Sequence, residues 1–436
     1  MSSGAWIGVA VAAVAAAYAL GSRRLSSTPL SSAIVFVGSG VVLGPAVLDL
    51  FDLGDDPAQI TGLLEFTLTL VLFTDAMTIR GRDLSTGGFL PGRLLGVGLL
   101  LSIGLGWLLA WPLLPGLTVW ELALVGAVLA PTDAALGKTA ISDVRVPALV
   151  RHGLNVESGL NDGMVLPFFV LFMAAIPGTH YAEEGATGVF WRALLLSTAL
   201  GLLVGGLGGR LLQWCRARGW VEGEWRQAYP VAVAVLSYQL AVVTDGSGFI
   251  AAWAAGFAFG FALRRHRAGV EKEPDRTADL AENLGGLLAS LSLLVFGAVL
   301  LGPALEHLSW RIVLYAVLSL TVVRMVPVAV SLVGSGLRPP TVAYLGWFGP
   351  RGLASVVLGL LVVEEQVHGM ELVGRVVAVT VGLSVLLHGV SAVALVGRYG
   401  RWYADAAATE PDLREGVPAP TGRGRREPGS PDEPGR

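Results

Sequence analysis

One apolar stretch with charged residues in its first half constrains the fold of this chain most. Asn155 to Ile176 reads NVESGLNDGMVLPFFVLFMAAI, and its uncharged part after Asp162 is about 14 residues long, whereas a membrane-crossing helix needs about 20. A helix that crosses a membrane here must begin upstream, near Arg151, and Asp162 then lies close to mid-membrane. An ionisable side chain at that depth costs roughly 2.5–3.5 kcal/mol, so Asp162 indicates a functional site. The alternative is that the Asn-Asp-Gly sequence at 161–163 forms a turn.

The composition is that of a protein with many membrane-spanning helices. Of its 436 residues 53% are hydrophobic and only 14% are charged, whereas a soluble domain has about 25% charged residues. The net charge of -3 gives no indication of a nucleic-acid partner, and the single cysteine, Cys215, excludes an intramolecular disulfide. No basic residue precedes the first apolar run, whereas Arg23 and Arg24 follow it. This order argues against a cleaved signal peptide and for a first helix whose N-terminus lies outside.

Apolar runs separated by polar loops predict about thirteen spans in an all-α polytopic membrane protein. Basic loops such as Arg216–Arg226 alternate with acidic loops such as Glu364–Glu371. By the positive-inside rule, the N-terminus lies outside, the C-terminus lies in the cytoplasm, and the protein resides in the cell membrane. Residues 399–436, rich in Pro, Gly, Arg and Glu, are expected to form a disordered cytoplasmic tail. The predicted spans are Ala5–Leu20, Leu30–Leu48, Ile60–Thr78, Leu94–Trp111, Val119–Leu136, His152–Ile176, Val189–Leu212, Tyr229–Val243, Phe249–Leu263, Leu284–Leu301, Ile312–Val333, Ala343–Val363 and Leu372–Val396.

Two predicted spans carry motifs typical of broken helices. The fifth contains Ala130-Pro131-Thr132-Asp133, where proline removes a backbone hydrogen bond and disfavours helix at the residue before it. Carbonyl groups freed in this way are tolerated at membrane depth where they line a site. A simple proline kink, with Asp133 near the cytoplasmic end, is the alternative. The twelfth span contains Gly349-Pro350-Arg351-Gly352, again a break beside a charge. In the short eighth and ninth spans, a re-entrant pair is the alternative to two full crossings.

The sixth span places its polar side chains on two faces of a helix. Ser158 and Asp162 are four residues apart and share one face, while Glu157 and Asn161 share the next. Such a helix offers oxygen ligands, which hard cations prefer, beside an ion-pair partner. The chain has no Cys/His cluster, which argues against a zinc or copper site. An arginine in the eleventh span, Arg324, requires a buried anion as partner.

The two broken spans lie seven apart in the chain, so they cross the membrane in opposite directions. Interrupted helices at corresponding positions of two inverted repeats indicate the binding site of a secondary transporter. Spans one to six and eight to thirteen would form the repeats, with the seventh as connector. This pattern argues against the turn interpretation of Asp162. His152 and His388 also border or lie within spans, and we interpret both as packed side chains rather than pH sensors.

Four of these motifs together resemble the cation:proton antiporter family of NhaP-type and NHE-type sodium/proton exchangers. The matching pieces are PTDA at 131–134, VESGLNDG at 156–163, the lone Arg324, and FGPRG at 348–352, and with the spans the resemblance covers roughly residues 1 to 398. It implies a NhaA/NhaP-like fold, no enzymatic activity, no cofactor, a homodimer in the lipid bilayer, and no nucleic-acid partner. The transported ions would be H+ and Na+, with K+ as the alternative and Li+ as a further substrate.

The resemblance also implies a role for each polar residue of the sixth span and its neighbours. Asp162 would take a proton and the cation in turn, and Asp133, the Thr132 carbonyl and Ser158 would complete the cation site. Asn161 would stabilise the unwound region of the broken helix. Relatives with asparagine at this position are electroneutral and those with aspartate are electrogenic, so we expect electroneutral exchange.

Outside that site, the resemblance implies a structural ion pair and a division into two groups of helices. Glu157 would pair with Arg324, and Arg351 would lie in the second crossing helix. Relatives often have proline where this chain has Ala134. Core helices at about 94–176 and 312–396 would move against a scaffold at about 5–78 and 189–301 that forms the dimer.

Two other classes of protein compete with this interpretation. An intramembrane aspartyl protease would also place two aspartates in separate helices. It would show Gly-x-Gly-Asp and Tyr-Asp motifs, and neither motif surrounds Asp133 or Asp162. An ion channel would show a repeated carbonyl loop that forms a selectivity filter, and the sequence contains none.

Overall fold

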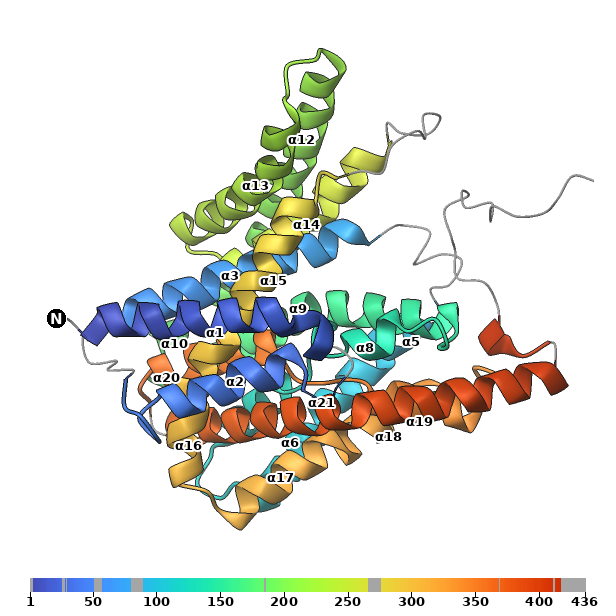
Figure 1. The fold of residues 1–436 in the computed structure, drawn as a ribbon. Coiled ribbons are helices and arrows are strands. Elements are labelled where there is room, and N and C mark those ends of the chain that lie inside the picture. The colour runs from blue at the N-terminus through green and yellow to red at the C-terminus, as the bar shows by residue number, and fades with distance from the viewer. Residues whose placement is uncertain are drawn as a thin grey trace, which may run out of the picture.

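The computed structural model describes residues 3–25, 28, 30–50, 57–79, 89–183, 186–265, 276–367, 369–410 and 412–416, and the regular structure in these ranges is helical. Each predicted span coincides with one helix or with a helix in two or three pieces (Figure 1), which confirms the all-helical, multi-span architecture. Seven helical stretches in these ranges are long and apolar enough to cross a membrane, and four shorter apolar helices accompany them.

The helices of the first half are α1 (Ser3–Leu25), α2 (Ser32–Leu43), α3 (Pro57–Thr78), α5 (Phe89–Arg93), η1 (Leu94–Leu99), α6 (Leu100–Leu113), α7 (Val119–Val128), α8 (Lys138–Ser142), α9 (Ala148–Ala174), α10 (His180–Glu183), α11 (Ala186–Trp191), η2 (Arg192–Leu196) and α12 (Ser197–Ala217). Those of the second half are α13 (Gly223–Val243), α14 (Gly248–Arg265), α15 (Asp279–Phe296), η3 (Gly297–Leu301), α16 (Gly302–Glu306), α17 (Trp310–Leu320), α18 (Val322–Ser331), α19 (Pro339–Trp347), α20 (Leu353–Glu364), α21 (Met370–Thr409) and η4 (Arg414–Gly416). The predicted eighth and ninth spans correspond to two helices, α13 and α14, of 21 and 18 residues, lengths that suit two full crossings.

Helix α9 accommodates the polar stretch at the centre of the molecule. It is continuous over 27 residues and begins upstream of Arg151, as the length argument requires. Asn161, Asp162 and Gly163 lie inside it, so the turn alternative is wrong. Its polar side chains Glu157, Ser158, Asn161 and Asp162 are all buried inside the protein, so they face other helices rather than lipid.

Two helices are interrupted where the sequence predicts breaks. Helix α7 ends at Val128 and the chain stays irregular until α8, so the helical part of the fifth span is shorter than predicted. Helix α19 ends at Trp347 and α20 begins at Leu353. Pro131 and Pro350 lie within the two breaks, where the missing N–H and the restricted preceding residue stop each helix.

Glycines allow very close packing in the group of helices formed by α1–α3 and α12–α15. Helix α14 contacts α3, α12 and α13, and α15 contacts α2 and α3. A Cβ atom on Gly205 of α12 would lie 2.1 Å from the carbonyl oxygen of Ala255 on α14. One on Gly256 of α14 would lie 2.2 Å from the carbonyl oxygen of Phe73 on α3. Small residues therefore set the spacing of these helices, as in other membrane proteins.

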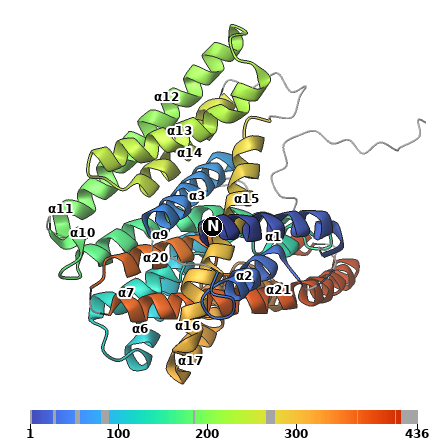
Figure 2. The same ribbon diagram turned by 60° about the vertical axis from the view of Figure 1, so that its left-hand side comes forward.

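A second group of helices contains both breaks. Helix α7 contacts α6 and α9, while α21 contacts α17 and α20. Figure 2 shows α12, α13 and α14 on one side of α3 and α9, with α6, α7, α17 and α21 on the other. The two groups meet where α3 contacts α9 and α20, and where α14 contacts α9.

The predicted boundary of the C-terminal tail is corrected by α21. This helix runs on to Thr409, past residue 399, because Tyr399 is buried and stacks on Tyr344 with ring centroids 4.3 Å apart. The chain then turns back, and Glu415 is fully buried against the start of α19. Its Oε1 accepts hydrogen bonds from the Arg338 N–H at 2.8 Å and the Thr341 hydroxyl at 2.8 Å. Residues 417–436 of the predicted tail lie outside the described residues.

Candidate ion-binding site

The two helix breaks meet, and Asp133 joins them. Its backbone N–H donates to the carbonyl oxygen of Pro350 at 2.8 Å. Its Oδ2 accepts from the N–H of Leu353 at 3.1 Å, at the start of α20, where a negative charge is favoured by the helix dipole. Its Oδ1 accepts from the N–H groups of Ala135 and Leu136 at 2.7 and 3.3 Å. Asp133 therefore holds both breaks together with its main chain and its side chain.

Arg351 satisfies the carbonyl groups that the first break releases. Its side chain is fully buried, and Nη1 donates to the carbonyl oxygens of Ala130 at 2.6 Å and Pro131 at 3.0 Å. Main-chain carbonyls left without helical partners in a buried position need such a donor. The arginine of the second break thus stabilises the irregular backbone of the first, next to Thr132.

Helix α9 contributes two polar contacts to the same piece of backbone. The Ser158 hydroxyl donates to the carbonyl oxygen of Thr132, and Asn161 Nδ2 donates to the Thr132 hydroxyl at 2.7 Å. Asp162 is 8% exposed, and its Oδ1 has no hydrogen-bond partner in the part of the chain that the structure describes. One buried carboxylate oxygen beside this junction is therefore free to accept a proton or a cation.

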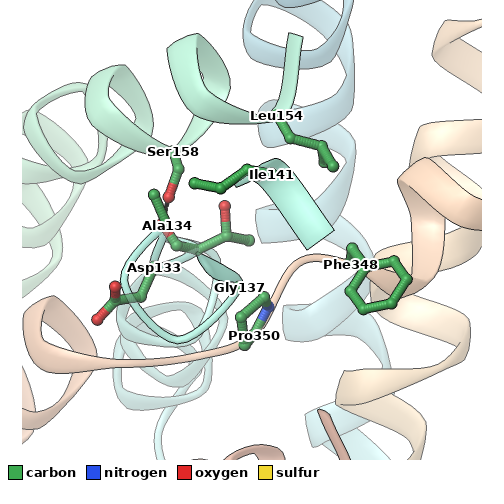
Figure 3. Close-up of a pocket in the computed structure, with 9 residues that line it drawn as sticks. Asp133, Ala134, Gly137, Ile141, Leu154, Ser158, Phe348 and Pro350 are labelled. Carbon is green, nitrogen blue, oxygen red and sulfur yellow. Dashed lines mark hydrogen bonds between the residues drawn. The ribbon is translucent and has the colours of Figure 1, made fainter. Parts of the chain in front are cut away.

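A small cavity lies between the first break and α9 (Figure 3). Its volume is about 10 Å³ for the centre of a water molecule, which is room for one water or one small ion. Asp162 does not line it; that residue lies one helical turn beyond Ser158 on α9. The cavity has both polar and apolar lining residues, which are Thr132, Asp133, Ala134, Gly137, Ile141, Leu154, Ser158, Phe348 and Pro350.

Glu157 and Arg324 form a buried bidentate ion pair between α9 and α18. Arg324 Nη1 donates to Glu157 Oε1 at 2.5 Å, and Nη2 donates to Oε2 at 2.9 Å. The side chains of Glu157 and Arg324 are 4% and 6% exposed. A Cβ atom on Gly349 would lie 2.3 Å from Arg324 Nε, so the glycine at the second break leaves the room that the guanidinium group occupies.

The structure places one more carboxylate near this site, which the sequence motifs do not include. Asp75 lies on α3, and a Cβ atom on Gly159 of α9 would be 3.4 Å from the Cβ of Asp75. Its carboxylate is close enough to interact electrostatically with Asp133 and Asp162. The signal was present in the sequence, because Asp75 is an ionisable residue inside the predicted third span. It was missed because no motif surrounds it.

Among the described residues, no group of three or more His, Cys, Asp or Glu side chains is arranged to hold a metal ion. Thr132, Ser158 and Asn161 are brought into direct contact, and Asp133 and Arg351 fix the backbone beside them. Asp162 lies beside this group, and its Oδ1 has no hydrogen-bond partner within the described ranges.

Comparison with known proteins gives one matching family. A family model described as "Sodium/hydrogen exchanger, transmembrane" matches residues 9–397. A probable Na(+)/H(+) antiporter of Schizosaccharomyces pombe is 24% identical over 364 residues, which are 78% of this chain and 46% of that protein. The K(+)/H(+) antiporter NhaP of Alkalimonas amylolytica is 25% identical over 306 residues, 69% of this chain and 49% of that one. The chain thus spans about half the length of these curated relatives.

The fold is similar to a solved structure of a sodium proton antiporter from Methanocaldococcus jannaschii. The TM-score is 0.73, and the match covers 91% of this chain and 98% of that chain. The sequence identity is only 19%, so this similarity concerns the fold.

Proposed function

Because the chain belongs to the transmembrane sodium/hydrogen exchanger family, we propose that it exchanges protons for a monovalent cation across a membrane. The family is one of transporters, so the hydrolase alternative is excluded. The observation that carries the proposal is the junction of two broken helices beside a buried carboxylate, Asp162, whose Oδ1 has no partner among the described residues. Interrupted helices that meet at mid-membrane are the usual binding site of a secondary transporter.

The proposed cation ligands are oxygen atoms only, which suits a hard monovalent ion. They are the Thr132 carbonyl, the Ser158 hydroxyl, and the carboxylates of Asp133 and Asp162. Ser158 now donates to the Thr132 carbonyl, so a bound cation would separate these two oxygens and contact both. Proton and cation would compete for Asp162, and this competition couples the two fluxes. Asp75 would add a third negative charge from α3.

We propose Na+ as the transported cation. The named relatives support this choice, since several are described as Na(+)/H(+) antiporters, whereas one is a K(+)/H(+) antiporter. K+ is therefore the second candidate. The neutral Asn161 supports a one-for-one, electroneutral exchange. It donates a hydrogen bond to the Thr132 hydroxyl, which an ionised aspartate at this position could not do.

Alternating access would follow from movement of one group of helices against the other. The core at about 94–176 and 312–396 would carry the site, and the scaffold at about 5–78 and 189–301 would stay fixed in a homodimer. The contacts of α3 with α9 and α20 mark the surface over which this movement would occur. We further propose that the protein lies in the cell membrane with its C-terminus in the cytoplasm.

The test is cation-driven proton movement in proteoliposomes of the purified full chain. A pH-sensitive dye inside the vesicles reports proton flux when Na+, K+, Li+ or choline is added outside. We expect Na+ to drive the flux, choline to leave it unchanged, and Asp162→Asn to abolish it. Asp405→Asn, an exposed aspartate on α21, is the matched control and should retain activity. Proton flux that persists in Asp162→Asn would overturn the site, and a wild-type protein inert to every cation would overturn the function.

A further inference from the structure

The second helix break leaves two backbone groups apart that a continuous helix would join. In an α-helix each N–H donates to the carbonyl oxygen four residues earlier, so the Arg351 N–H would donate to the Trp347 carbonyl. Trp347 is the last residue of α19, and Arg351 lies in the irregular segment before α20. Both positions are inside the protein, where unpaired backbone groups are costly. The Trp347 carbonyl oxygen also accepts from the Gly349 N–H at 2.8 Å, which leaves one of its two lone pairs for a further donor.

Two side chains of α21 fill the gap between these groups. The Arg351 N–H donates to Ser384 Oγ at 2.8 Å. His388 Nδ1 lies 3.2 Å from Ser384 Oγ and 2.9 Å from the Ser384 carbonyl oxygen, and His388 Nε2 lies 2.9 Å from the Trp347 carbonyl oxygen. Ser384 and His388 are four residues apart, so they lie one above the other on the same face of α21.

We propose that Ser384 and His388 form a side-chain relay that replaces the missing Arg351-to-Trp347 helical hydrogen bond. The Trp347 carbonyl can only accept, so His388 Nε2–H donates to it. In the proposed relay the imidazole is neutral and Nδ1 accepts from the Ser384 hydroxyl, whereas a hydrogen on Nδ1 would instead be donated to the Ser384 carbonyl oxygen. Ser384 and His388 then each accept one hydrogen bond and donate one, in the direction from the Arg351 N–H to the Trp347 carbonyl oxygen. His388 and Ser384 are buried, so water does not substitute for the relay.

The relay acts on the ion site through Arg351. The backbone of this residue is held by Ser384, while its guanidinium group donates to the carbonyl oxygens of Ala130 and Pro131. The next residue is Thr132, whose carbonyl is a proposed cation ligand. His388 is thus a positioning residue, which sets the geometry of the site without touching the ion. This inference rests on the proposed antiport function.

A neighbouring contact separates the relay from ordinary packing of Trp347. The Trp347 indole Nε1 donates to Ser391 Oγ at 3.0 Å, and its ring lies 5.2 Å from the His388 ring. Ser391 therefore holds the same tryptophan by its side chain, whereas His388 holds it by its backbone. Variants at the two positions distinguish backbone positioning from side-chain packing.

The test compares His388→Leu with His388→Gln in proteoliposomes, with the apparent KM for Na+ and the pH profile of exchange as readouts. Leucine removes the relay, and we expect the apparent KM to rise about tenfold, as for loss of one buried hydrogen bond. Glutamine has a donor and an acceptor, so it should keep the KM within about twofold of wild type. Ser391→Ala should keep the KM and the pH profile of wild type. An unchanged KM in His388→Leu would overturn the proposal, as would equal damage by glutamine or by Ser391→Ala.

A second measurement does not depend on transport. We expect Ser384→Ala and His388→Leu each to lower the Tm in detergent, and the double variant to lower it no further than the more damaging single variant, because both break one chain of hydrogen bonds. Additive losses of Tm would overturn the relay. If the wild-type protein moves no protons, the proposed function fails, but the Tm cycle still tests the relay.

Discussion

At the residue scale, the Glu157–Arg324 pair gives the clearest stability prediction. Glu157→Ala leaves the Arg324 guanidinium buried with no counter-charge, since its two short contacts are to this carboxylate. Breaking a buried pair by removing one partner costs about 3–5 kcal/mol, so we expect a large fall in the Tm of the detergent-solubilised protein.

The control for this prediction is an ion pair on the surface. Glu371 and Arg375 lie four residues apart on α21, and the Glu371 side chain is 77% exposed. Exposed pairs contribute little, so Glu371→Ala should leave the Tm near that of wild type. The double variant Glu157→Ala/Arg324→Met should recover part of the lost Tm, because it removes the uncompensated charge. A Tm unchanged by Glu157→Ala would show that the pair is not a structural link.

A glycine at the second break gives another residue-scale prediction. A Cβ atom on Gly352 would lie 2.0 Å from Asp133 Oδ2, so Gly352→Ala must displace the carboxylate that joins the breaks. Overpacking of this kind costs about 1–3 kcal/mol, and we expect proton–cation exchange in proteoliposomes to be lost. Gly286→Ala on α15 is the matched control, because a Cβ atom there would meet no atom within 4 Å. Normal exchange in Gly352→Ala would contradict the proposed role of this junction.

At the scale of single elements, the sequence predicts where the helices break, but not which side chains form hydrogen bonds with the backbone groups at the breaks. Pro131 and Pro350 stop α7 and α19 for local reasons, so their effect is visible in the sequence. The carbonyl groups without helical partners accept hydrogen bonds from Arg351 and His388, which are far away in the sequence. A histidine four residues after a serine is not a distinctive pattern, so the sequence alone predicts only a packed side chain at His388. No motif surrounds Asp75 either, and its proximity to α9 follows from the packing of two helices far apart in sequence.

The start of α19 is capped by a residue from the other end of the chain, and this contact predicts an effect on stability. Arg338 precedes two prolines and has no local side-chain cap, and Glu415 accepts its N–H instead. Loss of a capping group costs about 1 kcal/mol, so Glu415→Ala should lower the Tm measurably. Glu410→Ala removes only an exposed pair with the same Arg338, with side chains about half exposed, and should have little effect. Equal Tm values for the two variants would show that Glu415 is not the cap.

At the scale of the whole molecule, the apolar runs predict every span, but not the contacts between the two groups of helices. An apolar run is a local property of the sequence, whereas the surface between α3 and α9 depends on glycines and on side chains far apart in sequence. The predicted start of the disordered tail at residue 399 is wrong for a related reason. The polar composition after residue 399 predicts disorder, yet Tyr399 and Glu415 have buried partners on α19.

Movement of the core against the scaffold would break contacts between the groups and preserve those within each group. The Thr61 hydroxyl on α3 donates to Glu364 at the end of α20, so this hydrogen bond joins the two groups. In a Cys215→Ser background, a disulfide between cysteines at positions 61 and 364 should stop exchange, and reduction should restore it. Within the scaffold, Ser292 on α15 donates to Thr67 on α3 at 3.3 Å, so a disulfide at these two positions should leave exchange intact. Full exchange by the cross-linked 61–364 protein would show that α3 and α20 do not separate during transport, and the division into a moving core and a fixed scaffold would then be wrong.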